Sequence, residues 1–173
     1  MRSSRKRAER IAICGMLLAL MLVLGFVESQ LPVAAGIPGV KLGLSNGVLI
    51  FAVYMFNIPT AFLLMVLKVL LSGMMFGNPS AMMYAFAGGA LSLTLMVLLS
   101  RMKDISPVVV SMVGGLSHNV GQVLLAMVIL GTPKLVYYMA VLMVVGMVTG
   151  LATGVAANGI IRRFRKENKL QKI

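Results

Sequence analysis

Long apolar runs separated by short polar breaks dominate the chain. Each run approaches or exceeds the roughly 20 mostly apolar residues that a helix needs to cross the hydrocarbon core of a bilayer. The runs lie at about 11–27, 42–56, 60–76, 80–100, 107–130 and 135–161. This pattern predicts an all-α integral membrane protein, a bundle of six transmembrane helices. The bundle occupies residues 11–161, between a basic N-terminus, 1–10, and a basic C-terminus, 162–173.

Prolines mark the starts of several of these helices. Asn78-Pro79, Ser106-Pro107 and Thr132-Pro133 each place a potential capping side chain directly before a proline. A cap satisfies free backbone N–H groups, and proline at the first helical position loses no hydrogen bond. Pro59 is expected to separate the second span from the third, because together they are too long for one crossing. Prolines and glycines within 32–39 predict a shaped loop after the first span.

Lysine and arginine gather on one side of the predicted bundle. The chain carries 16 of them against four acidic residues, a formal net charge of +12. With six spans, both basic ends and the 101–103 loop fall on the same side, and the opposite side receives only Lys41 and Lys134. The positive-inside rule then places both termini in the cytoplasm. Because the charges flank apolar runs and form no face of a soluble fold, they do not indicate nucleic-acid binding.

Lys68 lies about halfway along the third span, where lipid accepts a charge poorly. A lysine at that depth costs roughly 2.5–3.5 kcal/mol on insertion scales, so it needs a partner or an aqueous cavity. One interpretation is that Lys68 snorkels or pairs with a carboxylate such as Glu28. The other is that it meets an anionic ligand.

The fifth span carries Ser117, His118, Asn119 and Gln122 close together. His118 and Gln122 are four residues apart and share a helix face. This set either forms hydrogen bonds between helices or lines a pocket, and the whole set favours a pocket.

Further polar residues, among them Gln30, fall at the outer side of the first two spans. Combined with the intramembrane set, they give a list of candidate substrate-binding residues: Glu28, Lys41, Asn46, Lys68, His118, Asn119 and Gln122. Two lysines and a histidine against one glutamate favour an anionic or polar ligand.

Small residues recur at four-residue spacing in two spans. Gly146, Gly150 and Gly154 follow this spacing in the last span, and Gly15 and Ala19 follow it in the first. Such stripes let helix backbones approach closely. We expect internal packing in the last span, and the stripe in the first span is a candidate contact with a partner protein.

Several kinds of chemistry are absent from the sequence. There is no G-x-x-x-x-G-K-[ST] motif for ATP, and Asp104 is the only aspartate, so no acidic cluster can hold the magnesium that diphosphate chemistry requires. With one histidine and one cysteine, Cys14, we expect no metal site. No nucleophilic side chain is spaced relative to a general base as in a known catalytic motif. We therefore expect no catalysis by this chain alone, and no cofactor.

Three stretches carry a resemblance to a known family. They are Pro-Gly-Val-Lys-Leu-Gly-Leu-Ser-Asn at 38–46, Leu-Lys-Val-Leu-Leu-Ser-Gly at 67–73 and Gly-Leu-Ser-His-Asn-Val-Gly-Gln at 115–122. The chain resembles, over about 10–162, the Gx transporter family, which is also catalogued as heptaprenyl diphosphate synthase component I. This group is similar to the substrate-binding S components of energy-coupling factor (ECF) transporters.

The resemblance implies a transport role in a bacterial plasma membrane. An S component captures a vitamin or similar micronutrient from outside, here a small micronutrient or an isoprenoid or quinone-type precursor, and it pairs with a transmembrane coupling protein and two ATPase subunits. In that family small residues of the first span meet the coupling protein, and here the match is Gly15 and Ala19.

Two other functions stay open. The first is a membrane subunit associated with isoprenoid or menaquinone synthesis, which would have a prenyl diphosphate synthase as partner and an isoprenoid or quinone precursor as ligand. The second is a structural membrane scaffold, in which the polar residues only pack.

Overall fold

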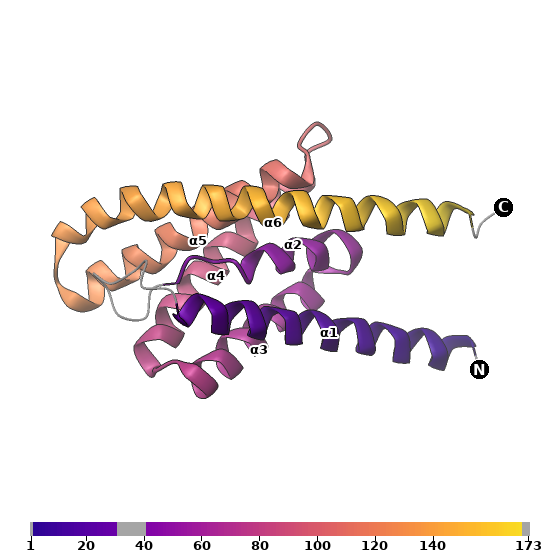
Figure 1. Cartoon of the computed structure of the whole chain (residues 1–173), viewed down its shortest axis with the longest axis horizontal. Coiled ribbons are helices and arrows are strands. Elements are labelled where there is room, and N and C mark those ends of the chain that lie inside the picture. Colours follow the sequence, from indigo (N-terminus) through magenta and orange to yellow (C-terminus); the bar gives the residue numbers. More distant parts are fainter. Residues whose placement is uncertain (1, 31–40, 171–173) are drawn as a thin grey trace.

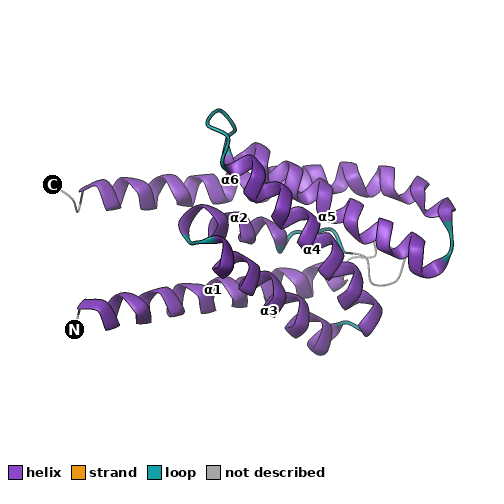
Figure 2. Ribbon diagram, turned by 180° about the vertical axis from the view of Figure 1, so that it is seen from behind, coloured by secondary structure: helices purple, strands orange, loops and turns teal. Residues whose placement is uncertain are grey.

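A computed structural model of the chain describes residues 2–30 and 41–170, and the regular secondary structure of this part is all helical (Figures 1 and 2). No strand occurs within those two ranges, which confirms the all-helical class. The elements in chain order are α1 (Arg2–Gln30), α2 (Asn46–Met55), α3 (Ile58–Phe76), α4 (Pro79–Ser100), α5 (Pro107–Leu130), the short 3-10 helix η2 (Pro133–Leu135) and α6 (Val136–Leu170).

Five of these helices are long and apolar enough to cross a membrane: α1, α3, α4, α5 and α6. The protein is therefore a multi-pass membrane protein. α2 has 10 residues, which rise about 15 Å, half of a hydrocarbon core of roughly 30 Å. The predicted second span is only partly helical because 41–45 is not helical and Gly43 adopts a left-handed φ of 88°. A sixth crossing stays a prediction.

The two longest helices bring both ends of the chain to one end of the bundle. Figure 1 shows the start of α1 and the end of α6 at the same end, with α2 between these two helices. The segment 41–45 and α2 together return the chain toward that end. α6 continues past the predicted boundary at 161, and its basic last turns extend the helix beyond the apolar part.

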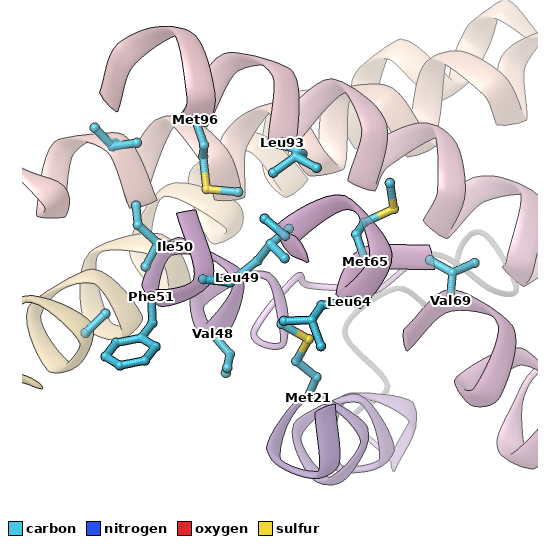
Figure 3. Packing of buried hydrophobic residues seen from close by; sticks show 14 of the residues in the cluster. Met21, Val48, Leu49, Ile50, Phe51, Leu64, Met65, Val69, Leu93 and Met96 are labelled. Atoms are coloured by element: carbon cyan, nitrogen blue, oxygen red, sulfur yellow. The ribbon is translucent and has the colours of Figure 1, made fainter. Parts of the chain in front are cut away.

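α2 lies at the centre of the hydrophobic core. Every residue from Asn46 to Ala52 is buried, and Leu49 and Ile50 are almost completely enclosed. Figure 3 shows this helix packed among side chains of α1, α3 and α4, including Met21 and Met65. A helix buried on all sides has no lipid-facing stripe, and its sequence is correspondingly apolar all round.

α5 and α6 pack backbone against backbone at the glycine stripe. A Cβ atom built on Gly146 would lie 2.6 Å from Asn119 Nδ2 and 2.6 Å from the Gly115 carbonyl oxygen, and one on Gly150 would lie 2.5 Å from the Ser111 carbonyl oxygen. Only glycine fits at these distances. The predicted role of the stripe in internal packing is confirmed.

Candidate substrate site in the polar core

The polar side chains predicted to bind a ligand are all buried. The described buried polar and charged residues are Glu28, Lys41, Ser45, Asn46, Lys68, Ser72, Ser92, Ser111, Ser117, His118, Asn119 and Gln122. All seven candidate substrate-binding residues are among them. They come from the end of α1, the segment 41–46, the middle of α3 and the middle of α5. Gln30, in contrast, is exposed.

Glu28 ties the end of α1 to the segment that leads into α2. Its carboxylate accepts a hydrogen bond from the backbone N–H of Leu44, and the Ser45 hydroxyl lies 3.4 Å from its second oxygen. The carboxylate also attracts Lys68 and Lys41 electrostatically. Pairing of Lys68 with Glu28 therefore stays a prediction, because the described contacts of Glu28 are with Leu44 and Ser45.

The charges of this cluster do not balance. Lys68 is 4% exposed, and Glu28 is the one acidic residue among the buried side chains that the structure describes. The Lys41 ammonium also lies 4.9 Å from the centre of the Phe76 ring, a cation–π contact that partly replaces lost hydration. Two buried cations against one anion leave a net positive site, and such a site attracts an anion.

Gln122 fixes Lys41 through the backbone. The Lys41 N–H donates to Gln122 Oε1 at 2.9 Å, and Gln122 Nε2 donates to the Lys41 carbonyl at 2.9 Å. This reciprocal pair satisfies both backbone groups of a residue outside any helix. Gln122 thus forms hydrogen bonds between separate parts of the bundle, the role expected of it when it is considered alone, and its contact with a ligand stays a prediction.

His118 is buried between two glycines. A Cβ atom on Gly43 would lie 3.1 Å from its Cδ2, and one on Gly88 would lie 2.9 Å from its Nδ1. Within the described part of the chain, neither ring nitrogen has a hydrogen-bond partner of good geometry, although the Gly88 backbone lies beside the ring. Two unsatisfied nitrogens in a buried ring are uncommon and mark a position that a ligand could satisfy.

Asn119 forms a hydrogen bond with α6. Its Nδ2 donates to the Leu142 carbonyl at 2.6 Å, and its Oδ1 has no hydrogen-bond partner among the described residues. The half-satisfied amide links the polar core to the last helix.

Asn46 reaches α4 through a residue that the sequence analysis did not single out. Asn46 Nδ2 donates to Ser92 Oγ at 2.7 Å, and Ser92 Oγ donates to the Gly114 carbonyl at 2.8 Å. This relay joins α2, α4 and α5. No sequence signal separates Ser92 from Thr94, the other hydroxyl in the middle of this apolar helix, whose side chain donates to the Ala90 carbonyl of its own helix.

Other predicted features lie apart from the polar core. Gly15 and Ala19 are exposed on α1, and nothing lies within 4 Å of a Cβ placed on Gly15. A cavity of about 200 Å³ with apolar walls lies between α1, α2 and α6.

The described residues contain no group of three or more His, Cys, Asp or Glu side chains placed to hold a metal. The predicted loop, and the stretch 38–40 of the first family motif, fall outside the described residues.

A bundle of long apolar helices around a buried, net positive polar core defines a multi-pass membrane protein with an internal polar site. Within that class, the model of the family described as heptaprenyl diphosphate synthase component I matches residues 17–160, so the chain belongs to this family. The resemblance drawn from the three sequence stretches is thereby confirmed. No curated protein and no solved structure gives a significant match.

Proposed function

We propose that this protein is the substrate-binding component of an ECF-type, ATP-driven importer, and that it captures a small anionic or polar micronutrient or precursor. The observation that carries the proposal is the polar core, where Lys68 is a buried charge and the buried His118 ring has no hydrogen-bond partner among the described residues. A bundle held together only by packing has no need of an extra buried cation or of an unsatisfied histidine.

The same core supplies a means of sensing the ligand. The segment 41–46 is held from α1 by Glu28, from α5 by Gln122 and from α4 by Ser92. An anion that approaches Lys68 and Lys41 competes with Glu28 for their charge. Ligand binding would therefore change the hydrogen bonds by which Glu28 of α1 holds this segment.

The direction of capture follows from the charge distribution. The positive-inside rule places the basic starts and ends of the chain in the cytoplasm, and Figure 1 places the η2 turn at the end of the bundle away from them. Glu28, near the far end of α1, then lies toward the outside. The exposed face of α1 around Gly15 and Ala19 is the proposed contact with the coupling protein, which in turn binds two ATPase subunits.

Native mass spectrometry of the protein purified gently from its own membranes tests this proposal. We expect a retained small anionic molecule that disappears in a Lys68→Met, His118→Leu double variant and persists in the control Gln30→Ala, because Gln30 is exposed. Equal retention by the double variant would show that the polar core is not the binding site.

The family description favours a second candidate, a membrane subunit that acts with a prenyl diphosphate synthase. This chain would then anchor a soluble enzyme at the cytoplasmic surface or supply that enzyme with its substrate. Co-purification separates the two candidates, because a coupling protein with ATPases indicates import and a soluble prenyl synthase indicates the second function. A pure scaffold would retain neither, and would tolerate apolar replacements throughout the polar core.

A further inference from the structure

The acidic side chains that could neutralise the polar core can be counted over the whole chain. They are Glu9, Glu28, Asp104 and Glu167. Glu9 and Asp104 are exposed, and Glu167 falls in the last turns of α6, beyond its apolar part. The stretch 31–40, between the two described ranges, contains no charged residue. Glu28 is therefore the one acidic side chain that the sequence and the described structure place in the polar core.

Two buried lysines share this single carboxylate. Lys41 and Lys68 are both buried, and Glu28 attracts both of them electrostatically. The Phe76 ring, 4.9 Å from the Lys41 ammonium, replaces part of the lost hydration but carries no charge. A buried cation without a counter-charge is costly. The polar core therefore lacks one negative charge, and the chain has no further acidic side chain there to supply it.

The size of this deficit favours a ligand with a single negative charge. One carboxylate would bring Lys41, Lys68 and Glu28 to electrical balance. A phosphate monoester carries about −1.5 to −2 at neutral pH, and a diphosphate carries more, so either would leave an excess of buried negative charge. The described buried residues also include no arginine, the side chain that binds phosphate with two parallel hydrogen bonds.

His118 adds a requirement for hydrogen bonding. The Lys68 ammonium lies close enough to the His118 ring to act on it electrostatically, so one small ligand can meet both side chains. A neutral imidazole has one N–H donor and one acceptor nitrogen, and neither has a partner of good geometry among the described residues. A carboxylate only accepts hydrogen bonds. A hydroxyl or amide group both donates and accepts, and it satisfies the ring in either tautomer.

We propose that the polar core binds a small monocarboxylate that also carries a hydroxyl or amide group. The carboxylate pairs with Lys68, and the hydroxyl or amide group bonds to the His118 ring. This inference rests on the proposed function, because it names the ligand class of that same site. It also separates the ligand from the diphosphates to which the family description refers.

A carboxylate built into the protein tests the charge deficit without any ligand. Ser72 lies one helical turn after Lys68 on the same face of α3, and it is 2% exposed. Ser72→Asp places a negative charge there, and Ser72→Asn is the matched neutral control of the same shape. After the retained molecule has been washed out, Ser72→Asp should have a thermal midpoint of unfolding about 2–4 °C above that of Ser72→Asn. The order should reverse in a Lys68→Met background, because the added carboxylate then lacks its counter-charge.

The molecule retained from the native membranes tests the ligand class. Amidation of the released molecule followed by tandem mass spectrometry counts its carboxyl groups and detects phosphorus. We expect one carboxyl group, at least one hydroxyl or amide group, and no phosphorus. Ser72→Asp should retain about tenfold less of this molecule than Ser72→Asn, or lower still, because the built-in carboxylate already neutralises Lys68.

Several results would overturn the inference. The same order of Ser72→Asp and Ser72→Asn in both backgrounds would show that Lys68 carries no uncompensated charge. A retained phosphate ester, diphosphate or dicarboxylate, or a monocarboxylate without a hydroxyl or amide group, would show that the ligand class is wrong.

Failure of the proposed function gives a different result. In that case the Lys68→Met, His118→Leu variant retains the small molecule as well as the unchanged protein does. The stability comparison at Ser72 needs neither a ligand nor transport, so it decides the charge deficit in either case.

Discussion

Gln122 and Lys41, 81 positions apart in sequence, are joined by two hydrogen bonds of 2.9 Å that run in opposite directions between the side-chain amide and the backbone. The pair closes the polar core at the point where the chain re-enters the bundle after α1. It also keeps the Lys41 ammonium next to Phe76. The position of a charged group near the proposed substrate site thus depends on a neutral side chain of α5.

Gln122→Ala should destabilise the protein markedly. It leaves the Lys41 N–H and carbonyl buried without partners, at about 1–3 kcal/mol for each unsatisfied group. Reversible denaturation in detergent or bicelles measures the free energy of unfolding, and hydrogen exchange of the Lys41 amide should become faster. Gln30→Ala, at an exposed position, should change neither quantity, and equal effects of the two changes would contradict the structural role of the pair.

Gly146→Ala should weaken the packing of α5 on α6. The new methyl group would meet a backbone oxygen and the Asn119 amide at 2.6 Å, and such overpacking costs about 1–3 kcal/mol. Gly159→Ala is the control on the same helix, because nothing lies within 4 Å of its Cβ. Since alanine favours a helix over glycine, the control should keep or raise the thermal midpoint of unfolding.

The helix starts were predictable because they depend on neighbouring residues. Ala81 N–H donates to Asn78 Oδ1 at 2.8 Å and Val109 N–H donates to Ser106 Oγ at 3.4 Å, as the two dipeptides predict. At Thr132 the expected side-chain cap is absent from the described contacts, and the hydroxyl donates to the Leu130 carbonyl instead. A 3-10 turn begins there, and α6 starts only afterwards.

The short α2 and the pairing inside the polar core were not predictable from local sequence. The left-handed Gly43 interrupts an apolar run that otherwise suits a full span, and a Cβ at this position would lie 3.1 Å from His118 Cδ2, on a helix far away in sequence. Residue types showed that Lys68 and His118 needed partners. What surrounds these two side chains depends on how several helices meet, and spacing along one helix does not carry that information.

Glu28 and Lys68 should be energetically coupled. Glu28→Gln leaves two buried lysines without their carboxylate, and Lys68→Met leaves that carboxylate with less positive charge nearby. Each single change should destabilise the protein, and the double variant should lose less than the sum of the two, by about 0.5–3 kcal/mol. Additive losses in a double-mutant cycle of unfolding free energies would show that the two charges do not interact.

The orientation of the bundle can be tested with cysteines placed in a Cys14→Ser background. Lys134→Cys, in the η2 turn, should react with a membrane-impermeant maleimide in intact cells, and Asp104→Cys should react only after the membrane is opened. Both positions are exposed, so accessibility within the protein does not limit either reaction. The opposite pattern would place the basic termini outside and reverse the proposed direction of capture.

His118→Leu should separate ligand binding from folding. Among the described residues the ring has no hydrogen-bond partner of good geometry, so an apolar side chain of similar size removes no such bond and should change the free energy of unfolding by less than about 1.5 kcal/mol. Asn119→Leu is the neighbouring contrast, because it loses the 2.6 Å bond to Leu142 and crowds Gly146. The Asn119→Leu variant should be clearly less stable.

If His118 binds a ligand, His118→Leu should lose the retained small molecule while it keeps its thermal midpoint of unfolding. A large loss of stability in His118→Leu, with the ligand still retained, would instead make His118 a packing residue and leave Lys68 as the main candidate for anion binding.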